Sequence, residues 1–195
     1  MTDTTAPPRF RQGSGRLCLD FVRTLRYRGT PGVAEELADP AALVAWVRQC
    51  GPPVDGPRSA APPTAADVRD ARALREAAYA LVSAALAAGG PAAPTATARV
   101  RLNRAAAAAV PVPYLTAAGE LRRRADDPVR AVLALVARDA LELAASPALL
   151  PRLHACASPE CGALFLDNSR PGTRRWCSMD ICGNRAKKST FRARS

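Results

Sequence analysis

Apolar side chains recur every three or four positions along several stretches of this chain, which is the spacing of one face of an α-helix. The longest such stretch is 65–88, where the repeating apolar positions are Val68, Ala71, Leu74, Ala78, Leu81, Val82 and Leu86. Thr64 is placed to cap the start of this helix, and a Gly-Gly-Pro segment follows its end. The pattern therefore predicts one long amphipathic helix.

Shorter stretches of similar pattern predict four more helices, over 17–25, 40–50, 96–109 and 129–146. Two of these helices follow an Asp-Pro pair, at Asp39 and at Asp127. This pair is a favourable helix start, because aspartate caps the free amides and proline suits the first turn. Trp46 lies on the apolar face of the second helix and is expected to anchor the core.

The segments between these helices contain a different pattern. VPYLTAAGELRRR, at 112–124, predicts a β-hairpin that turns at Ala118 and Gly119. The Pro- and Gly-rich stretch 51–63 predicts a linker or a long surface loop. Residues 1–14 are polar with scattered Pro and Gly, and they are expected to form a disordered lead-in.

The fold class that follows is mainly α (α+β). A helical N-terminal domain with a small β-hairpin is expected over 15–150, and a small C-terminal module over 151–195. Pro147 and Pro151 mark the boundary between them. At 195 residues and 48% hydrophobic content, the chain can bury a substantial core. It has no uncharged run of eighteen apolar residues, which argues against a transmembrane helix.

The C-terminal module contains four cysteines in two Cys-x4-Cys pairs, which are Cys156, Cys161, Cys177 and Cys182. Zinc is held tetrahedrally by four soft ligands, and two close pairs brought together in space supply them. The spacing therefore predicts one structural zinc ion. Because so small a module buries little apolar surface, zinc is expected to order it, and chelation to unfold residues 152–195 while leaving the helical domain intact.

Two other uses of four cysteines are disulfide bonds and an iron–sulfur cluster. Disulfides need an oxidising compartment, and the first residues have no apolar segment of the kind found in secretory signals. The protein is therefore expected in the cytoplasm, where Cys18 and Cys50 would be buried thiols. An iron–sulfur cluster would be distinguished by metal analysis. His154, the only histidine, is a candidate substitute ligand, although four thiolates already complete a tetrahedron.

The residues after the first cysteine pair predict a strand-turn-helix. The segment ALFLD, at 163–167, has strand character, and 169–173, with Pro171 and Gly172, forms a turn. Ser178 is placed to cap a final helix over 179–194. Arg185, Lys188 and Arg192 fall three and four positions apart and so share one face, which Lys187 and Arg194 widen.

Positive charge is concentrated in this module. The chain has a net charge of +11, and residues 152–195 hold nine Lys or Arg against three acids. After Asp180 there are five basic residues and no acid. Such an asymmetry is typical of a surface that neutralises phosphates, so DNA is the expected partner. A solvated basic tail, RNA and an acidic protein are the alternatives.

The segment CASPECGALFLDNSRPGTRRWCSMDICGNRAKK closely resembles the CGNR zinc-finger family, in which the family motif corresponds to Cys182–Arg185. The preceding region resembles the stress-induced transcription-regulator (ABATE) domain, through LCLDFVRT at 17–24. That motif more often has Asn where this chain has Arg23. The resemblance covers nearly the whole chain from about residue 15. It implies a bacterial transcription regulator of the stress response that binds DNA through the CGNR helix.

Several residues of the module have both a structural and a functional interpretation. Gly183 allows close packing at the metal site. Asn184 bonds a cysteine sulfur or the preceding loop, or it reads an adenine edge. Arg185 pairs with Asp167 or Asp180, or it contacts phosphate. Arg174 and Arg175 flank Trp176, which is expected in the module core, and both arginines are candidate phosphate contacts.

We expect no catalysis, because the sequence has neither a phosphate-binding Gly-rich loop nor a zinc site with an open ligand position. The predicted function is transcription regulation by zinc-dependent DNA binding. The alternatives are a zinc-finger protein–protein interaction module or RNA binding. The helical domain would sense a small-molecule effector, or form a homodimer that presents two fingers to DNA half-sites.

Overall fold

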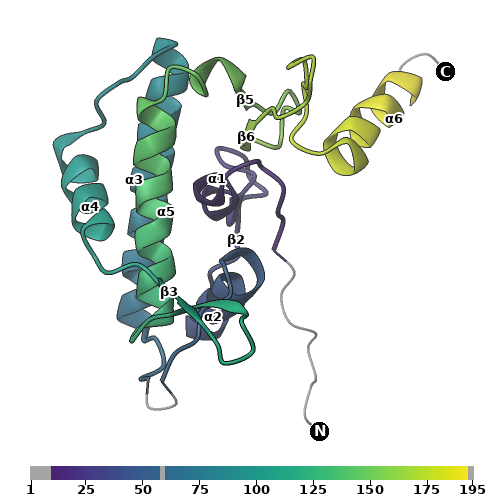
Figure 1. Ribbon diagram of the computed structural model, residues 1–195. Helices are drawn as coiled ribbons and strands as arrows, with labels where there is room; N and C mark the ends of the chain where they lie inside the picture. Colours follow the sequence, from purple (N-terminus) through teal and green to yellow (C-terminus); the bar gives the residue numbers. More distant parts are fainter. Residues whose placement is uncertain (1–9, 58–59, 193–195) are drawn as a thin grey trace, which may run out of the picture.

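A computed structural model describes residues 10–57 and 60–192 of the chain, apart from the side chains of residues 189–192 (Figure 1). The six α-helices are α1 (Leu17–Val22), α2 (Pro40–Cys50), α3 (Ala65–Ala88), α4 (Ala96–Ala106), α5 (Pro128–Ala145) and α6 (Asn184–Arg192). The strands are β1 (Leu25–Arg26), β2 (Ala34–Glu35), β3 (Val112–Leu115), β4 (Leu121–Arg124), β5 (Leu153–Ala155) and β6 (Leu164–Leu166). The strands form three antiparallel pairs, β1–β2, β3–β4 and β5–β6.

The helical domain is built on α3 and α5, which lie side by side and contact each other as well as α4 (Figure 1). The predicted caps are confirmed. The Thr64 and Asp67 side chains form a reciprocal capping box on α3, and Asp39 and Asp127 each accept a backbone N–H at the start of α2 and α5. Gly89 ends α3 in the left-handed conformation, with φ of 63°.

The main hydrophobic core lies where α1 and α2 pack against these helices. Trp46 of α2 and Phe21 of α1 are fully buried and meet edge to face, with ring centroids 4.7 Å apart. Trp46 is therefore the core anchor that the sequence predicted. Mostly small side chains of α3 and α5, such as Ala78 and Ala137, fill the remaining interior and let the helices approach closely.

The N-terminal part departs from the prediction in two places. The first helix ends at Val22, because the Thr24 backbone and hydroxyl both bond to the Phe21 carbonyl, and Leu25 then begins strand β1. Residues 1–9 lie outside the described part of the chain. Residues 10–14, which were expected to be disordered, are packed: Phe10 is buried in the main core and exchanges two hydrogen bonds with the Gln49 side chain.

The predicted hairpin at 112–124 is confirmed as β3–β4, with Leu115 paired to Leu121. Its connection to the rest of the domain is the loop around Asp55. The Tyr114 hydroxyl donates to the Asp55 carboxylate at 2.7 Å, and the Asp55 amide bonds to the Arg123 carbonyl at 2.8 Å. The 51–63 stretch has no helix among its described residues, in agreement with a surface loop.

The C-terminal module is joined to the helical domain through its strands. Successive side chains of a strand point to opposite faces, and both faces of β6 are buried. Leu164 and Leu166 belong to the main core, whereas Phe165 belongs to a second cluster with the four cysteines. Strand β5, which the sequence analysis missed, adds Leu153 to the main core. In Figure 1, β5 and β6 lie beside α1, and α6 lies farther from the helical domain than these strands. None of the helices in the described ranges is long and apolar enough to cross a membrane.

Candidate metal centre

The four cysteines are presented by three local structures. Cys156 follows β5 and Cys161 lies in the turn before β6, where the Cys156 amide bonds to the Ala163 carbonyl at 2.8 Å. Cys177 lies in the loop after β6. Cys182 lies in a single π-helical turn, Met179–Gly183, which the Ser178 hydroxyl caps by accepting the Ile181 amide. The fold therefore brings both Cys-x4-Cys pairs to one place.

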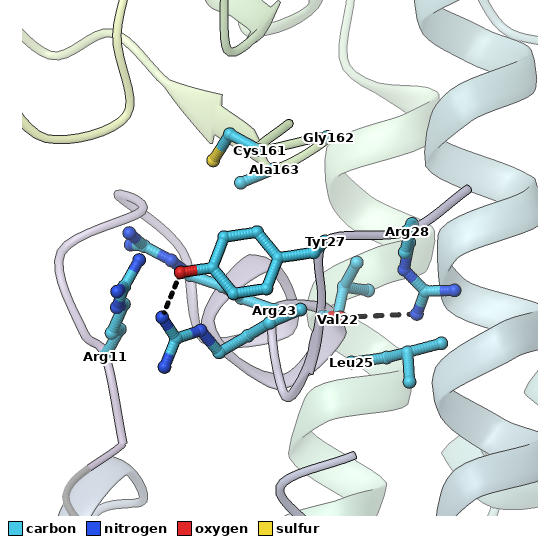
Figure 2. Close-up of a pocket in the computed structure, with 10 residues that line it drawn as sticks. Arg11, Val22, Arg23, Leu25, Tyr27, Arg28, Cys161, Gly162 and Ala163 are labelled. Carbon is cyan, nitrogen blue, oxygen red and sulfur yellow. Dashed lines mark hydrogen bonds between the residues drawn. The ribbon is translucent and has the colours of Figure 1, made fainter. Parts of the chain in front are cut away.

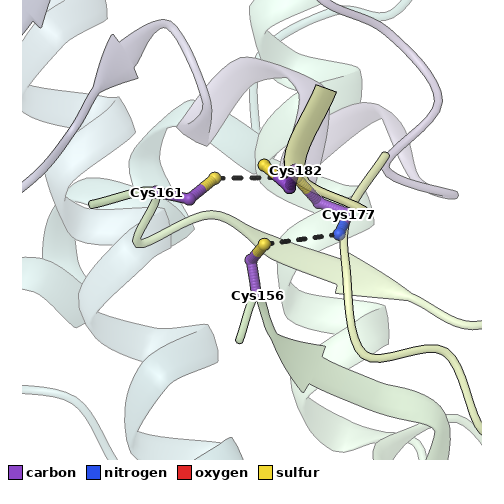
Figure 3. Close-up of side chains that lie close together, drawn as sticks. All are labelled: Cys156, Cys161, Cys177 and Cys182. Carbon is purple, nitrogen blue, oxygen red and sulfur yellow. Dashed lines mark hydrogen bonds between the residues drawn. The ribbon is translucent and has the colours of Figure 1, made fainter. Parts of the chain in front are cut away.

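The sulfur atoms are arranged as a tetrahedral zinc ion requires. All four sulfurs lie within 4.8 Å of one another, and all four residues are buried. Cys161 Sγ and Cys177 Sγ are 3.6 Å apart, and Cys177 Sγ and Cys182 Sγ are 3.8 Å apart. Sulfurs bound at about 2.3 Å to a tetrahedral zinc would be separated by about 3.8 Å. Figure 3 shows the four side chains converging. The set fits one four-coordinate zinc ion.

The thiols interact with one another electrostatically. The hydrogen bond between Cys161 and Cys177 lowers the pKa of the Cys161 thiol and raises the pKa of the Cys177 thiol. Burial raises the pKa of Cys182 to about 11. Zinc binds cysteine as the thiolate, so its binding must displace the protons that remain on the four thiols. We therefore expect affinity for zinc to increase with pH.

Arg23 is a further component of the centre that sequence reasoning did not assign. Its side chain comes from the end of α1 and is 6% exposed. Nη2 donates to Cys177 Sγ at 3.5 Å, and Nη1 donates to the Ser14 hydroxyl at 3.3 Å. The guanidinium forms no ion pair with a carboxylate of the described residues. A charged residue directly after the apolar positions Phe21 and Val22 was the available signal.

Asp167 organises the loop between the two cysteine pairs. It is fully buried, and its carboxylate accepts the amides of Ser169 at 2.9 Å and Arg174 at 2.8 Å. Burial alone would raise the pKa of Asp167, but these amides hold it at about 2. Arg152 closes the same loop from η1 (Leu150–Arg152) by donating to the Asp167 carbonyl at 2.8 Å.

Of the two arginines beside Trp176, Arg174 turns inward. Its guanidinium lies 5.1 Å from the Phe165 ring centroid and donates to the Cys177 carbonyl at 2.9 Å. Arg175 is exposed and lies 5.2 Å from the Trp176 ring centroid. Trp176 is partly buried against the cysteine cluster, so Phe165 is the principal core residue of the module. Arg174 is thus used to hold the loop, while Arg175 faces solvent.

The last helix differs in its start from the prediction. It begins as the π-helical turn that carries Cys182 and becomes α-helical only at Asn184. Asn184 donates to the Asp180 carbonyl at 3.1 Å, which lies within the π-helical turn, so its partner is neither a cysteine sulfur nor the loop before the helix. A Cβ on Gly183 would meet the Met179 side chain at 2.9 Å, so its small size serves packing against Met179.

The basic residues of the finger have different surroundings. Arg185 pairs with Glu160 at 3.0 Å, and neither Asp167 nor Asp180 is its partner. Lys187 and Lys188 are exposed and form no ion pair with the described residues. The Arg192 side chain and residue 194, which were also predicted to contact DNA, lie outside the described part of the chain.

The other candidate residues lie apart from the sulfurs. His154 is not part of the cysteine group, and its ring lies 5.6 Å from that of Phe165. Cys18 is buried in the main core, and burial raises its pKa well above the usual value. Cys50 is half-buried, and burial raises its pKa to about 11. Both are free thiols, and their burial indicates a role in packing.

Two family models match the chain. The ABATE model, with the description "Putative stress-induced transcription regulator", matches residues 15–147. The CGNR zinc finger model matches residues 152–195, which include the four cysteines and α6. No curated protein matches the chain.

Proposed function

Because the chain belongs to the ABATE family and ends in a CGNR zinc finger, we propose that it is a transcription regulator that binds duplex DNA through α6. One observation carries the proposal. The zinc-binding turn leads directly into α6, whose first two turns present Lys187 and Lys188 to solvent without an acidic partner among the described residues. Free, exposed cations beside one another are suited to phosphates.

The position of α6 supports this function. It lies at the end of the finger farthest from α3 and α5, so a duplex can approach it without meeting the bundle (Figure 1). Zinc fixes the start of α6 through Cys182, which is three residues before Arg185. We propose that the role of zinc is to set the direction of this helix. No catalytic role is proposed, since four thiolates leave no open coordination position.

We place this function in the bacterial cytoplasm, where DNA is accessible and where reducing conditions keep the zinc ligands as thiols. The contact proposed for α6 is with the DNA backbone. The described basic side chains of this helix are suited to phosphates, which give affinity and orientation, whereas sequence is read at base edges.

The test is a titration of duplex DNA against the full-length zinc protein at several salt concentrations, with anisotropy as the readout. The variant is Lys187→Glu with Lys188→Glu. The matched control is Arg99→Glu with Arg104→Glu, two exposed reversals on α4. If each lysine contacts one phosphate, neutralisation alone removes about 1.8 from the slope of log affinity against log salt. Zinc content should be unchanged in both proteins.

The competing functions are separated in the same assay. RNA duplex and poly-glutamate serve as competitors, and duplex DNA should displace the bound probe at the lowest concentration. Stronger competition by RNA or by poly-glutamate would replace DNA binding with one of the alternatives. Equal loss of binding in the α4 control would show only a general charge effect and would contradict the role of α6.

A further inference from the structure

A group of cations gathers where the first strand meets the finger. A small cleft there is lined by Arg11, Arg23, Arg26 and Tyr27 on the side of the helical domain, and by Cys161 and Gly162 on the side of the finger. Figure 2 shows the Arg11 and Arg23 guanidinium groups near the hydroxyl end of the Tyr27 ring. The cleft is therefore positively charged and is formed by both parts of the chain.

Tyr27 is held in an unusual conformation at the centre of this group. Its φ is 55°, and it is the only residue other than glycine with positive φ in the described ranges. The left-handed conformation is unfavourable for a residue with a Cβ, because the Cβ crowds the following carbonyl oxygen. Thr30 stabilises the turn, because its amide and hydroxyl bond to the Tyr27 carbonyl at 3.2 and 2.9 Å. Unusual backbone of this kind is often found at binding sites.

The Tyr27 hydroxyl is surrounded by donors. Arg26 Nη2 donates to it at 2.7 Å, and the positive charge of Arg185, from α6 of the finger, also acts on it. Burial alone would raise the pKa of Tyr27, but Arg185, Arg26 and Arg11 together bring it below the usual value. The phenolic oxygen thus occupies a position where several positive charges favour an anionic oxygen.

These cations are only partly neutralised. Arg26 pairs with Glu36 at 3.0 Å, and these side chains are only 23% and 18% exposed. Arg185 pairs with Glu160 at 3.0 Å, and these side chains are 45% and 70% exposed. An exposed pair of this kind is worth little, so an incoming anion can replace it. Arg11 forms no ion pair with the described residues, although its backbone is fixed beside the buried Phe10.

The zinc centre is the nearby negative group that must be considered. Four thiolates on one zinc ion have a formal charge of −2, which would repel a second anion. Arg23 donates to Cys177 Sγ from the same cleft and so offsets part of this charge. Arg11 lines the other side of the cleft without an ion-pair partner among the described residues, and the charge of Arg185 acts on the neighbouring Tyr27 hydroxyl.

We propose that Arg11, Arg26, Tyr27 and Arg185 form a phosphate-binding subsite that takes one phosphate of the DNA backbone. Arginine is suited to this because its planar fork donates two hydrogen bonds to one phosphate, and the Tyr27 hydroxyl adds a second type of donor. The subsite extends the surface of α6 onto the helical domain. As a DNA contact it rests on the proposed function, whereas its ability to bind a phosphate group does not.

The experiment uses the full-length zinc protein with Arg11→Gln and Tyr27→Phe, each compared with Arg99→Gln on α4. Arg99 is an exposed arginine on a helix away from the finger (Figure 1). In the DNA arm, Arg11→Gln should weaken binding about tenfold at low salt, as expected for one lost charge-assisted hydrogen bond. It should also reduce the salt slope by up to about 0.9. Tyr27→Phe should weaken binding in the same direction, and Arg99→Gln should change neither quantity.

A second arm titrates inorganic pyrophosphate into the same proteins and follows the binding heat. Wild type and Arg99→Gln should bind, and Arg11→Gln should bind at least several-fold more weakly. If wild type binds no DNA, the proposed function fails, and this arm still decides the subsite. If Arg11→Gln matches Arg99→Gln in both arms, the subsite is wrong, while DNA binding through Lys187 and Lys188 stands or falls by its own variants.

Discussion

Replacing Arg23 by methionine should weaken zinc binding without unfolding the helical domain. The guanidinium is 6% exposed and donates to Cys177 Sγ at 3.5 Å. It has no carboxylate partner among the described residues, so the zinc-thiolate centre is its counter-charge. Methionine retains most of the side-chain length and removes the charge. It therefore leaves no buried unpaired donor in place of the guanidinium, and Ser14 loses only one long hydrogen bond.

The size of the effect follows from the nature of the lost contact. A hydrogen bond to a charged group contributes about 1.5–3 kcal/mol, which corresponds to about ten- to a hundredfold in an equilibrium constant. Loss of a group that supports a metal ligand typically costs a similar ten- to hundredfold in metal affinity. We therefore expect the dissociation constant for zinc to increase by about this factor in Arg23→Met.

The assay is competition for zinc with a chromophoric chelator at fixed pH, together with far-UV circular dichroism of each protein. Arg72→Met is the matched control. Arg72 lies on α3, donates to the Leu37 carbonyl at 2.6 Å and is not part of the cysteine cluster. It should retain wild-type zinc affinity even if it is less stable. Wild-type affinity in a folded Arg23→Met protein would refute the assignment of Arg23 as the counter-charge.

Three further results are expected. Glu35→Gln should destabilise the helical domain by about 2–3 kcal/mol in urea unfolding, because Glu35 binds the buried Arg75 through two hydrogen bonds of 2.6 and 2.7 Å. Burial alone would raise the pKa of Glu35, but Arg75 holds it below the usual value. The contribution of this pair to the free energy of unfolding is therefore complete above about pH 4.3 and decreases as the pH falls below it. Glu35→Gln should not show this pH dependence. Gly15→Ala should destabilise the protein more than Gly119→Ala. Both glycines have positive φ, but only at position 15 would an added Cβ lie 2.9 Å from a backbone atom, the Leu166 carbonyl oxygen. Equal melting temperatures of the two variants would contradict this packing. Chelation should increase amide hydrogen exchange in α6 and around the cysteines but much less in β6, whose leucines belong to the main core; uniform exchange over 152–192 would show that the finger unfolds as one unit.

The sequence was a good guide wherever structure depends on neighbouring residues. The caps at Asp39, Thr64 and Asp127 and the turn at Gly119 act over three or four positions, so their signals are local. The cysteine ligands could be predicted for a chemical reason, because two thiol pairs at short spacing have few other uses in a reducing compartment.

The missing parts depend on contacts between distant residues. Strands β1 and β2 have two residues each, and they are supported by Arg75 of α3, which binds Glu35, and by the pair of Arg26 with Glu36, directly after β2. The Arg23 contact with Cys177 joins positions 154 residues apart. Arg185 pairs with Glu160, although Asp167 and Asp180 were equally good partners by charge alone. No local pattern distinguishes among such partners.

The structure also changes how the finger should be regarded. A module of about forty residues was expected to depend on zinc alone, yet β5 and β6 form a wall shared by the main core and the metal cluster. The Leu166 amide bonds to the Ser14 carbonyl at 2.8 Å, and Ser14 in turn accepts from Arg23. Zinc, Arg23 and the 10–15 segment are therefore one connected set of contacts. Since coupling between two binding events is reciprocal, any ligand that shifts α1 must change the affinity for zinc, and zinc must change the affinity for that ligand by the same factor.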